Sequence, residues 1–228
     1  MTESFEWHVE AERKWNERAE FWNANSQNMW DEGSRKTIIP FMKRYLKEGT
    51  HIADIGCGDG YGSFKLNQAG FAVTGLDISP EMVELAKNNL ENEQLTFMQG
   101  DLAGLPFESN QFNGIMAINS LEWVEHPYVA LKELKRVTKP GGRLCVGVLG
   151  PTAHPRENSY LRLYGEDVIC NTMMPWEFEK MARENGFNIL DGHGVYKRGV
   201  SPKHVADLPK ELEQSLSFLW VSMLELVE

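Results

Sequence analysis

The 228-residue sequence lacks the features of membrane and secreted proteins. No apolar run approaches the about 20 residues that a membrane-spanning helix needs. The N-terminus is acidic and polar, whereas a signal peptide is basic and then apolar. Internal repeats and low-complexity tracts are also absent. We therefore expect a cytoplasmic protein that has no membrane partner.

Cysteine is scarce, which excludes a disulfide scaffold and a cysteine-based metal site. The three cysteines, Cys57, Cys145 and Cys170, are odd in number and lack metal-ligand spacing. Reduced thiols are the normal state of such cysteines inside the cell. We expect no metal ion.

Basic residues are outnumbered by acidic ones, 23 to 33, which gives a formal net charge of −10. No run of Lys and Arg is present. Binding to a nucleic-acid backbone depends on clustered Lys and Arg, so we expect no nucleic-acid partner. Hydrophobic residues make up 42% of the chain, which is enough to bury the core of one domain. A length of 228 residues is short for two domains.

The stretch from residue 52 to residue 62 carries the clearest chemical signal in the chain. An apolar run ends in Asp54 and opens into alternating glycines, which predicts a strand, a tight turn and a helix start. Counted from Gly56, the third position of the dinucleotide-binding pattern holds Tyr61 instead of glycine. The carboxylates of Asp54 and Asp59 would repel a pyrophosphate and attract an ammonium or a sulfonium group. S-adenosylmethionine is such a ligand.

Two further strands are expected to end in an acid. Residues 71–77 end in Asp77, about twenty residues after Gly56, where a ribose-binding carboxylate stands in a βαβ unit. Residues 95–99 lead to Asp101. In a parallel sheet these strand ends share one edge, which is where ligands bind.

Together these motifs resemble the class I S-adenosylmethionine-dependent methyltransferases, over about residues 34–195. The likeness is to the small-molecule type, similar to quinone-biosynthesis methyltransferases. It implies an α/β fold: a Rossmann-like, doubly wound, mostly parallel sheet with helices on both faces. An N-terminal helical lid and a cap segment after strand five are also implied. We expect one domain, residues 1–228, divided into N-terminal helices (1–48), a cofactor-binding core (49–149), the cap segment (150–174) and a C-terminal part (175–228).

The resemblance also implies the cofactor, S-adenosylmethionine, and the residues that hold it. The glycine loop would hold the methionine part and Asp77 the ribose hydroxyls, while Ile78 and Leu102 pack on the adenine and Asp101 accepts from its amino group. The expected cofactor residues are Asp54, Gly56, Cys57, Gly58, Asp77, Ile78, Met82, Asp101, Leu102 and Asn119, with Trp30 and Arg35 as further candidates.

Residues 119–127 follow the fourth expected strand, where the transferred methyl group should project. Many small-molecule family members have a His after a Leu-Glu pair, and here Trp123 holds that place. His126 and Glu122 are the candidate acid–base residues as a hypothesis, and the alternative for His126 is a loop histidine without a chemical duty. Trp123 either walls the substrate site or fills the core.

Residues 150–174 form a long segment rich in turn residues and aromatics. Loops of this length often carry function. Tyr160, Arg162 and Tyr164 are therefore candidate substrate contacts, and an ordinary packed loop explains them as well.

The two ends of the chain are predicted to be helical. Residues 3–24 carry Trp15, Ala19 and Trp22 at helical spacing, either as a lid or as a packed helix. Ser34 is predicted to cap a helix over residues 35–47. Near the other end, apolar residues at helical spacing predict a last helix, with only residues 223–227 left for a final strand. These residues are Leu208, Leu212, Leu216, Leu219 and Met223. Their apolar face packs on the domain or on a second copy, so we expect a monomer or a homodimer.

We expect an enzyme that transfers a methyl group from S-adenosylmethionine to an O, N or C nucleophile of a small molecule. Positioning in a water-poor site can supply much of the catalysis of such an in-line displacement. The alternatives are a non-catalytic S-adenosylmethionine-binding module and a nucleotide-dependent oxidoreductase. A substrate cavity walled by Trp123 and residues 150–174 would favour the enzyme.

Overall fold

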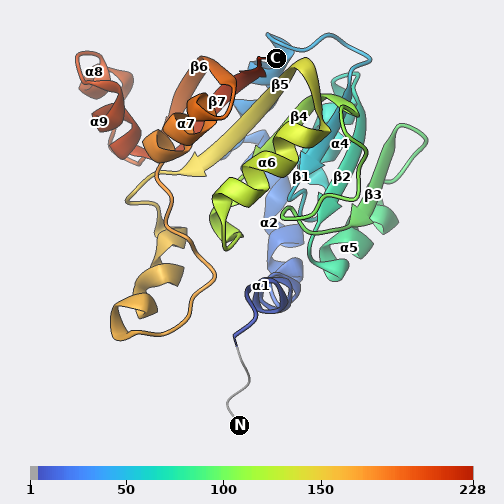
Figure 1. Ribbon diagram of the computed structural model, residues 1–228, viewed down its shortest axis with the longest axis horizontal. Helices are drawn as coiled ribbons and strands as arrows, with labels where there is room; N and C mark the ends of the chain where they lie inside the picture. The colour runs from blue at the N-terminus through green and yellow to red at the C-terminus, as the bar shows by residue number, and fades with distance from the viewer. Residues whose placement is uncertain (1–4, 228) are drawn as a thin grey trace.

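The computed structural model describes residues 5–227, which form a seven-stranded sheet covered by helices (Figure 1). The strand order is β3-β2-β1-β4-β5-β7-β6, in which the first five are parallel and β7 is antiparallel to both of its neighbours. The strands are β1 (His51–Ile55), β2 (Ala72–Asp77), β3 (Leu95–Gln99), β4 (Phe112–Ile118), β5 (Thr138–Leu149), β6 (Phe187–Tyr196) and β7 (Ser217–Leu226). The predicted α/β, Rossmann-like fold is confirmed.

Helices cover both faces of the sheet because its central strands are apolar on both sides. Neighbouring residues of β4 show this: Ile115 packs in the cluster under α6 (Pro127–Val137) and α7 (Pro175–Glu184), and Met116 packs in the opposite cluster. That second cluster lies under α3 (Ile38–Lys43), α4 (Tyr61–Gln68) and α5 (Pro80–Leu90). In Figure 1, α6 lies in front of the strands. Nearly continuous apolar strands are typical of a sheet buried on both faces.

The helix α5 begins as its sequence predicts. The Oγ of Ser79 accepts a hydrogen bond from the backbone N–H of Met82, at 3.1 Å, and Pro80 occupies the first helical position. Proline suits that position because its missing N–H would have no partner there. The cap fixes the start of α5 directly after the end of β2, where Asp77 stands.

The N-terminal region contains two helices where the sequence predicted one. Helix α1 (Trp7–Asn16) and helix α2 (Ala19–Asp31) are separated by a turn at residues 17 and 18, and residues 3 and 4 lie outside the described residues. The predicted helix over residues 35–47 is also wrong in its bounds. Helix α3 starts at Ile38 after Thr37, and Ser34 lies in the preceding turn. The consecutive turns at residues 33–37 bring the chain from α2 back to the sheet.

The predicted last helix is wrong over most of its length. Two short helices, α8 (Pro202–Val205) and α9 (Lys210–Ser215), precede a ten-residue strand, β7, which lies between β5 and β6. Leu219 and Met223, assigned to a helix face by their spacing, are fully buried in this strand. A strand buried on both faces has no polar–apolar alternation, so its apolar run imitates a helical pattern.

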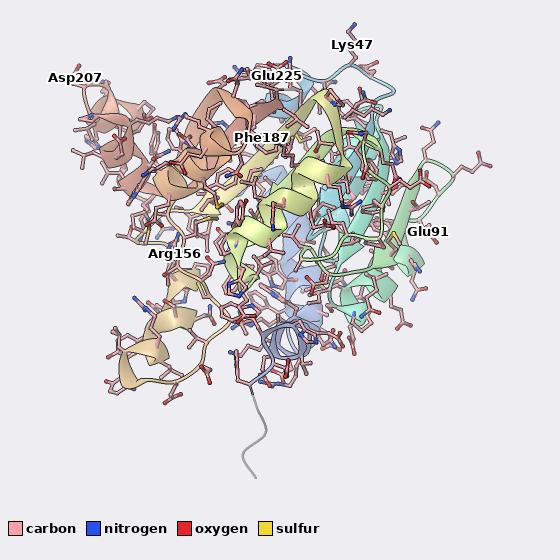
Figure 2. All side chains as sticks on the ribbon, in the orientation of Figure 1. Lys47, Glu91, Arg156, Phe187, Asp207 and Glu225 are labelled. Atoms are coloured by element: carbon pink, nitrogen blue, oxygen red, sulfur yellow. The ribbon has the colours of Figure 1, made fainter. Side chains whose placement is uncertain are left out.

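Residues 150–174 project from the sheet and contain the 3-10 helix η2 (His154–Tyr164), gold in Figure 1. The side chain of Arg156, labelled in Figure 2, fixes this segment to the end of β5. Its guanidinium donates to the carbonyls of Gly150 at 2.8 Å, Leu149 at 2.5 Å and Met173 at 2.6 Å. Both ends of the segment are thereby tied to one buried side chain.

Across residues 5–227, none of the helices has both the length and the apolar character that crossing a membrane requires.

Candidate functional site

A chamber of about 1100 Å³ lies at the edge of the sheet where the parallel strands end. One wall consists of the glycine loop after β1 and the loops after β2, β3 and β4. The opposite wall consists of α1, α2 and the start of η2. The chamber thus occupies the edge that the sequence predicted for ligand binding. Its volume exceeds the range of about 300–1000 Å³ that single ligand pockets occupy.

The glycine loop presents bare backbone to the chamber. Gly56 and Gly58 both have positive φ, +78° and +57°. A Cβ atom on Gly56 would lie 2.6 Å from the Cβ of Ser120, whereas one on Gly58 would meet open space. Ser120 also lines the chamber, and its buried hydroxyl has no hydrogen-bond partner among residues 5–227. An unpaired buried hydroxyl beside exposed backbone is a polar position that a ligand could satisfy.

Asp77 is held with its carboxylate against this loop. Its Oδ2 accepts from the N–H of Gly58 at 2.8 Å, and its Oδ1 accepts from the N–H of Ser79 at 3.0 Å. Burial raises the pKa of the carboxyl group above its usual value. Each carboxylate oxygen has further acceptor capacity, so Asp77 can receive two hydroxyl groups from the chamber side.

Beyond Asp77 the wall is apolar and ends in a second acid. Ile78, Met82 and Leu102 line this part of the chamber together with Asp101. The Oδ1 of Asp101 accepts from the N–H of Ala103 at 2.8 Å, which orients the carboxylate. An apolar slot closed by one oriented acceptor suits a flat heterocycle that carries an amino group.

Two more acids stand close to the glycine loop. Asp59 lines the chamber and accepts from the hydroxyl of Ser26 on α2. Asp54 lies behind the loop, does not line the chamber and accepts from the Oγ of Ser63 at 2.6 Å. Burial raises the pKa of Asp54 to about 7 and also raises that of Asp59. A cationic ligand beside these carboxyl groups would favour their ionised form.

Arg35 contributes the opposite charge. Its guanidinium lies over the rings of Trp22 and Trp30, 5.0 and 5.5 Å from their centres, and the side chain lines the chamber. Within residues 5–227 it makes no hydrogen bond or ion pair. Its donors are therefore free for an anionic group of a ligand. Trp30 does not line the chamber; its ring packs on Gly62 and beneath Arg35.

The loop after β4 turns sharply at Asn119, which has φ of +56° and lines the chamber. Glu122, three residues on, is fully buried and is not part of the lining. Its Oε1 accepts from the N–H of Leu149 at 2.5 Å and from the side-chain amide of Asn119 at 3.4 Å. Burial raises the pKa of Glu122. This carboxyl group braces the loop and does not reach the chamber.

Trp123 and His126 both line the chamber. The Trp123 ring is buried and meets Trp15 edge-on, with ring centres 5.2 Å apart. The carbonyl of Trp123 accepts from the Nε1 of Trp7 at 2.7 Å, which ties α1 to this loop. The side chain of His126 is 70% exposed and lies 3.9 Å from Glu125. His126 therefore stands at the rim of the chamber, in contact with water.

The cap segment reaches the chamber through residues other than those predicted. Tyr160, Arg162 and Tyr164 do not line it, whereas Leu161 does. Arg162 donates instead to the carbonyl of Ser159 at 2.7 Å, and the two tyrosine hydroxyls face each other at 3.2 Å. The residues that sequence reasoning missed include His8, Arg18, Met29, Leu161 and Phe218. Only Leu161 had a local signal, since it stands among the predicted aromatic residues.

Within the described part of the chain, no group of three or more His, Cys, Asp or Glu residues could hold a metal ion.

Comparisons with known proteins identify relatives of this chain. The family described as "Methyltransferase domain" matches residues 53–146. An O-methyltransferase of Aspergillus sclerotiorum, resE, is 30% identical over 176 residues, covering 71% of this chain and 67% of its own length. A ubiquinone biosynthesis O-methyltransferase of Coxiella burnetii is 27% identical over 210 residues, covering 82% of this chain and 87% of its own.

Solved structures show the same fold at low identity. A methyltransferase crystallised with the Haloferax volcanii Trm112 methyltransferase activator has a TM-score of 0.75 at 19% identity, covering 96% of this chain and 98% of that one. An S-adenosylmethionine-dependent methyltransferase of Methanosarcina mazei has a TM-score of 0.64 at 23% identity, covering 83% and 98%.

Proposed function

Because the chain belongs to the class I S-adenosylmethionine-dependent methyltransferases, we propose that it methylates an oxygen atom of a small-molecule acceptor. We choose oxygen as the acceptor atom because the two relatives described above are both named as O-methyltransferases. A small acceptor is inferred from the concave chamber and from the net charge of −10, which disfavours nucleic acids.

The chamber residues fit S-adenosylmethionine in charge and in shape. Asp77 would receive the ribose hydroxyls, Asp101 and the apolar slot would hold the adenine, and Arg35 would pair with the methionine carboxylate. Ser120, whose hydroxyl has no hydrogen-bond partner within residues 5–227, and Gly58, where an added Cβ would meet open space, also line the chamber. When bound, S-adenosylmethionine supplies an electrophilic methyl group on a positively charged sulfur.

The buried acids favour a cationic occupant of this half of the chamber. Asp59 and Asp77 line this half of the chamber, and Asp54 lies directly behind it. Among the proposed cofactor residues, the guanidinium of Arg35 is the cationic group that balances these three carboxyl groups. Charges interact more strongly in a buried site than in water, so these carboxylates would stabilise a sulfonium and an ammonium. They would not suit a pyrophosphate, which argues against the oxidoreductase alternative.

One observation carries the enzymatic proposal: the lining of the chamber extends well beyond the proposed cofactor residues. Its walls there include Trp123 from the loop after β4, Leu149 at the end of β5, and Pro155 and Leu161 from the cap segment. A module that only binds the cofactor has no need of such space. In this half, the chain would exclude water and orient the acceptor oxygen towards the methyl group.

His126 is the proposed proton acceptor for an acceptor hydroxyl that must ionise. Its ring lines the chamber at the rim, with the carboxylate of Glu125 3.9 Å away. For an acceptor that is already ionised, positioning alone suffices. Glu122 is proposed as a positioning residue because its bonds run to the backbone of Leu149 and to Asn119.

The test begins with ligand binding. Thermal unfolding is measured with S-adenosylmethionine, S-adenosylhomocysteine and NAD, on the wild type and on Asp77→Ala. A ligand at a hundred times its dissociation constant adds about 2.7 kcal/mol, enough to raise the melting temperature by several degrees. We expect both sulfur ligands to stabilise the wild type, NAD to have no effect and Asp77→Ala to lose the response. Stabilisation by NAD alone would contradict the proposal.

The second step uses S-adenosylmethionine with a radiolabelled methyl group and fractionated small-molecule extracts. A labelled small product that resists ester hydrolysis and carries the methyl group as an ether is the expected result. Label found in protein or nucleic acid only would contradict the proposed acceptor class and leave the cofactor assignment intact.

A further inference from the structure

Helix α1, dark blue in Figure 1, turns one side towards the chamber. The residues of α1 and of the turn after it that line the chamber fall on one face by their helical spacing. They are Trp7, His8, Ala11, Lys14, Trp15 and Arg18. Two of the six, Lys14 and Arg18, are cationic. The wall opposite the sheet therefore carries positive charge into the chamber.

The charges on the outer side of α1 neutralise one another. Arg13, which does not line the chamber, forms ion pairs with Glu10 at 2.8 Å and with Glu17 at 2.5 Å. The hydrogen bond from Arg13, more than the charge of Lys14, lowers the pKa of Glu10. The acids that stand nearest to the chamber cations in the sequence are thus already paired with Arg13.

The two cations on the chamber side have no carboxylate partner within residues 5–227. Lys14 is only partly exposed, and in this part of the chain it makes neither a hydrogen bond nor an ion pair. The guanidinium of Arg18 donates to the Oδ1 of Asn158 at 3.0 Å and lies 5.8 Å from the centre of the Trp15 ring. That bond uses one of its five N–H donors. Both side chains can therefore donate to an anionic ligand.

The acids that line this half of the chamber stand at its open rim. Glu125 lies 3.9 Å from His126, and Glu157 lies 3.2 Å from His154. The side chains of these two acids are 58% and 75% exposed, so water screens their charge. The positive charge on the α1 wall is therefore left for a ligand to balance.

We propose that the acceptor is a hydroxy acid whose carboxylate binds Lys14 and Arg18 while its hydroxyl group is methylated. This inference rests on the proposed function. A guanidinium and an ammonium form strong, charge-assisted hydrogen bonds with a carboxylate. On a chain with a net charge of −10, an anion also needs such local positive charge to enter the chamber.

The carboxylate takes no part in the bond changes. The bond between the methyl carbon and the sulfur breaks, and a bond from that carbon to the hydroxyl oxygen forms. The hydroxyl proton passes to His126, the proposed proton acceptor. The products are S-adenosylhomocysteine and a methyl ether that keeps its carboxylate. Lys14 and Arg18 thus act on binding and orientation.

The test compares acids with neutral molecules of the same shape. Protein saturated with S-adenosylhomocysteine, which occupies Arg35, is titrated by calorimetry with 2-, 3- and 4-hydroxyphenylacetate and with the three matching amides. At least one acid should bind about tenfold more tightly than its amide, because hydrogen bonds to charged groups are stronger than those to neutral ones. No binding of any acid, or equal affinities of acid and amide, would overturn the proposal.

Substitutions then locate the carboxylate. The double variant Lys14→Gln and Arg18→Gln should lose the preference for the acid, while the affinity for the amide changes by less than about threefold. Asn158→Ala removes the partner of Arg18 and keeps both cations, so the preference should remain. Lys87→Gln is the control, since Lys87 is exposed on α5 and does not line the chamber. A full preference in the double variant would contradict the assignment.

The remaining outcomes separate this inference from the proposed function. If S-adenosylhomocysteine does not bind, the proposed function fails and the hydroxy-acid site fails with it. If it binds and acids bind no better than amides, only the hydroxy-acid site fails. If Arg35→Gln loses the preference and the double variant keeps it, the carboxylate lies at Arg35 and the inference is wrong.

Discussion

At the scale of single residues, Gly56 shows how closely the glycine loop approaches its surroundings. Its φ of +78° and the 2.6 Å that would separate an added Cβ from Ser120 impose two independent penalties on any side chain. Gly141 has a similar φ of +72°, but nothing lies within 4 Å of the position of its Cβ. A side chain at Gly141 would therefore meet backbone strain alone, whereas one at Gly56 would meet both backbone strain and steric overlap.

We predict that Gly56→Ala lowers the free energy of unfolding by roughly 3 kcal/mol, and Gly141→Ala by about 1 kcal/mol. Urea denaturation of both variants measures the two losses. Gly56→Ala should also lose stabilisation by S-adenosylhomocysteine, because the displaced Ser120 borders the ligand space. Equal losses of stability in the two variants would show that the loop can move away from Ser120.

Arg35 is expected to recognise one part of the cofactor only. In Arg35→Gln, S-adenosylhomocysteine should bind about 10- to 100-fold more weakly, since a hydrogen bond to a charged group contributes about 1.5–3 kcal/mol. The affinity for 5′-methylthioadenosine, which lacks the amino-acid part, should change by less than about threefold. Calorimetric titration measures both ligands.

Arg44→Gln is the matched control for Arg35. Arg44 also lies over aromatic rings, those of Phe41 and Tyr45, but it pairs with Asp191 and does not line the chamber. Both ligands should bind it as tightly as they bind the wild type. A similar loss for the two ligands in Arg35→Gln would assign Arg35 a structural role.

Asp54 should make the stability of the ligand-free protein depend on pH. Burial raises its pKa from 3.8 to about 7, so between these values Asp54 is ionised in the unfolded chain and protonated in the folded one. Stability from this group is complete below pH 3.8 and is lost as the pH rises to about 7. Asp54→Asn removes this loss and should therefore be more stable than the wild type at pH 8, by at most about 4 kcal/mol, and equally stable near pH 4.

Glu133→Gln serves as the comparison because the pKa of Glu133 is shifted in the opposite direction, downwards. A hydrogen bond from Arg136, at 2.7 Å, holds the pKa of Glu133 below its usual value. The ionised carboxylate therefore stabilises the fold at a pH above the pKa of Glu133 in the unfolded chain. This contribution is lost as the pH falls through the lower pKa of the folded state. Glu133→Gln should lose stability at neutral pH and approach the wild type in acid. Urea denaturation at pH 4 to 8 measures both variants, and a pH-independent difference for Asp54→Asn would contradict the assignment.

At the scale of elements, helix α1 is tied to the loop after β4 by a hydrogen bond that a conservative change can remove. Trp7→Phe keeps an aromatic ring and deletes the donor to the carbonyl of Trp123. A hydrogen bond contributes about 1 kcal/mol, so amide hydrogen exchange in α1 should quicken by about fivefold. Trp220→Phe is the control: its Nε1 donates to Glu179, and exchange should quicken around α7 and β7 and not in α1. Unchanged exchange in α1 of Trp7→Phe would show that packing alone holds the helix.

The elements that sequence reasoning predicted correctly are those with local signals. Helix α5 carries its cap and proline in adjacent residues, β1 has Asp54 next to its last residue, and β2 ends in Asp77. Strand β7 had no such signal, because both of its faces are buried and the spacing of Leu216, Leu219 and Met223 imitates a helix. Its assignment as a strand depends on β5 and β6, which exchange backbone hydrogen bonds with it on its two sides.

At the scale of the whole molecule, the two halves of the chamber differ in how far the sequence could predict them. The proposed cofactor half comes from consecutive strand ends, so Gly56, Asp77 and Asp101 could be assigned from motifs. The proposed acceptor half is assembled from segments that lie far apart, such as Phe21 and Leu161. Which of their side chains face one another depends on tertiary packing. Arg156 is a similar case, because only the fold brings three carbonyls to its guanidinium.

The position of β7 has a consequence for how the molecule is made. Strands β5 and β6 do not pair with each other, and each uses β7 as its partner, so the sheet is interrupted until residues 217–226 have been synthesised. A nascent chain that ends before Ser217 exposes two open strand edges, and such edges are templates for aggregation. We therefore expect the ribosome-bound chain to need protection by a chaperone until β7 emerges and closes the sheet.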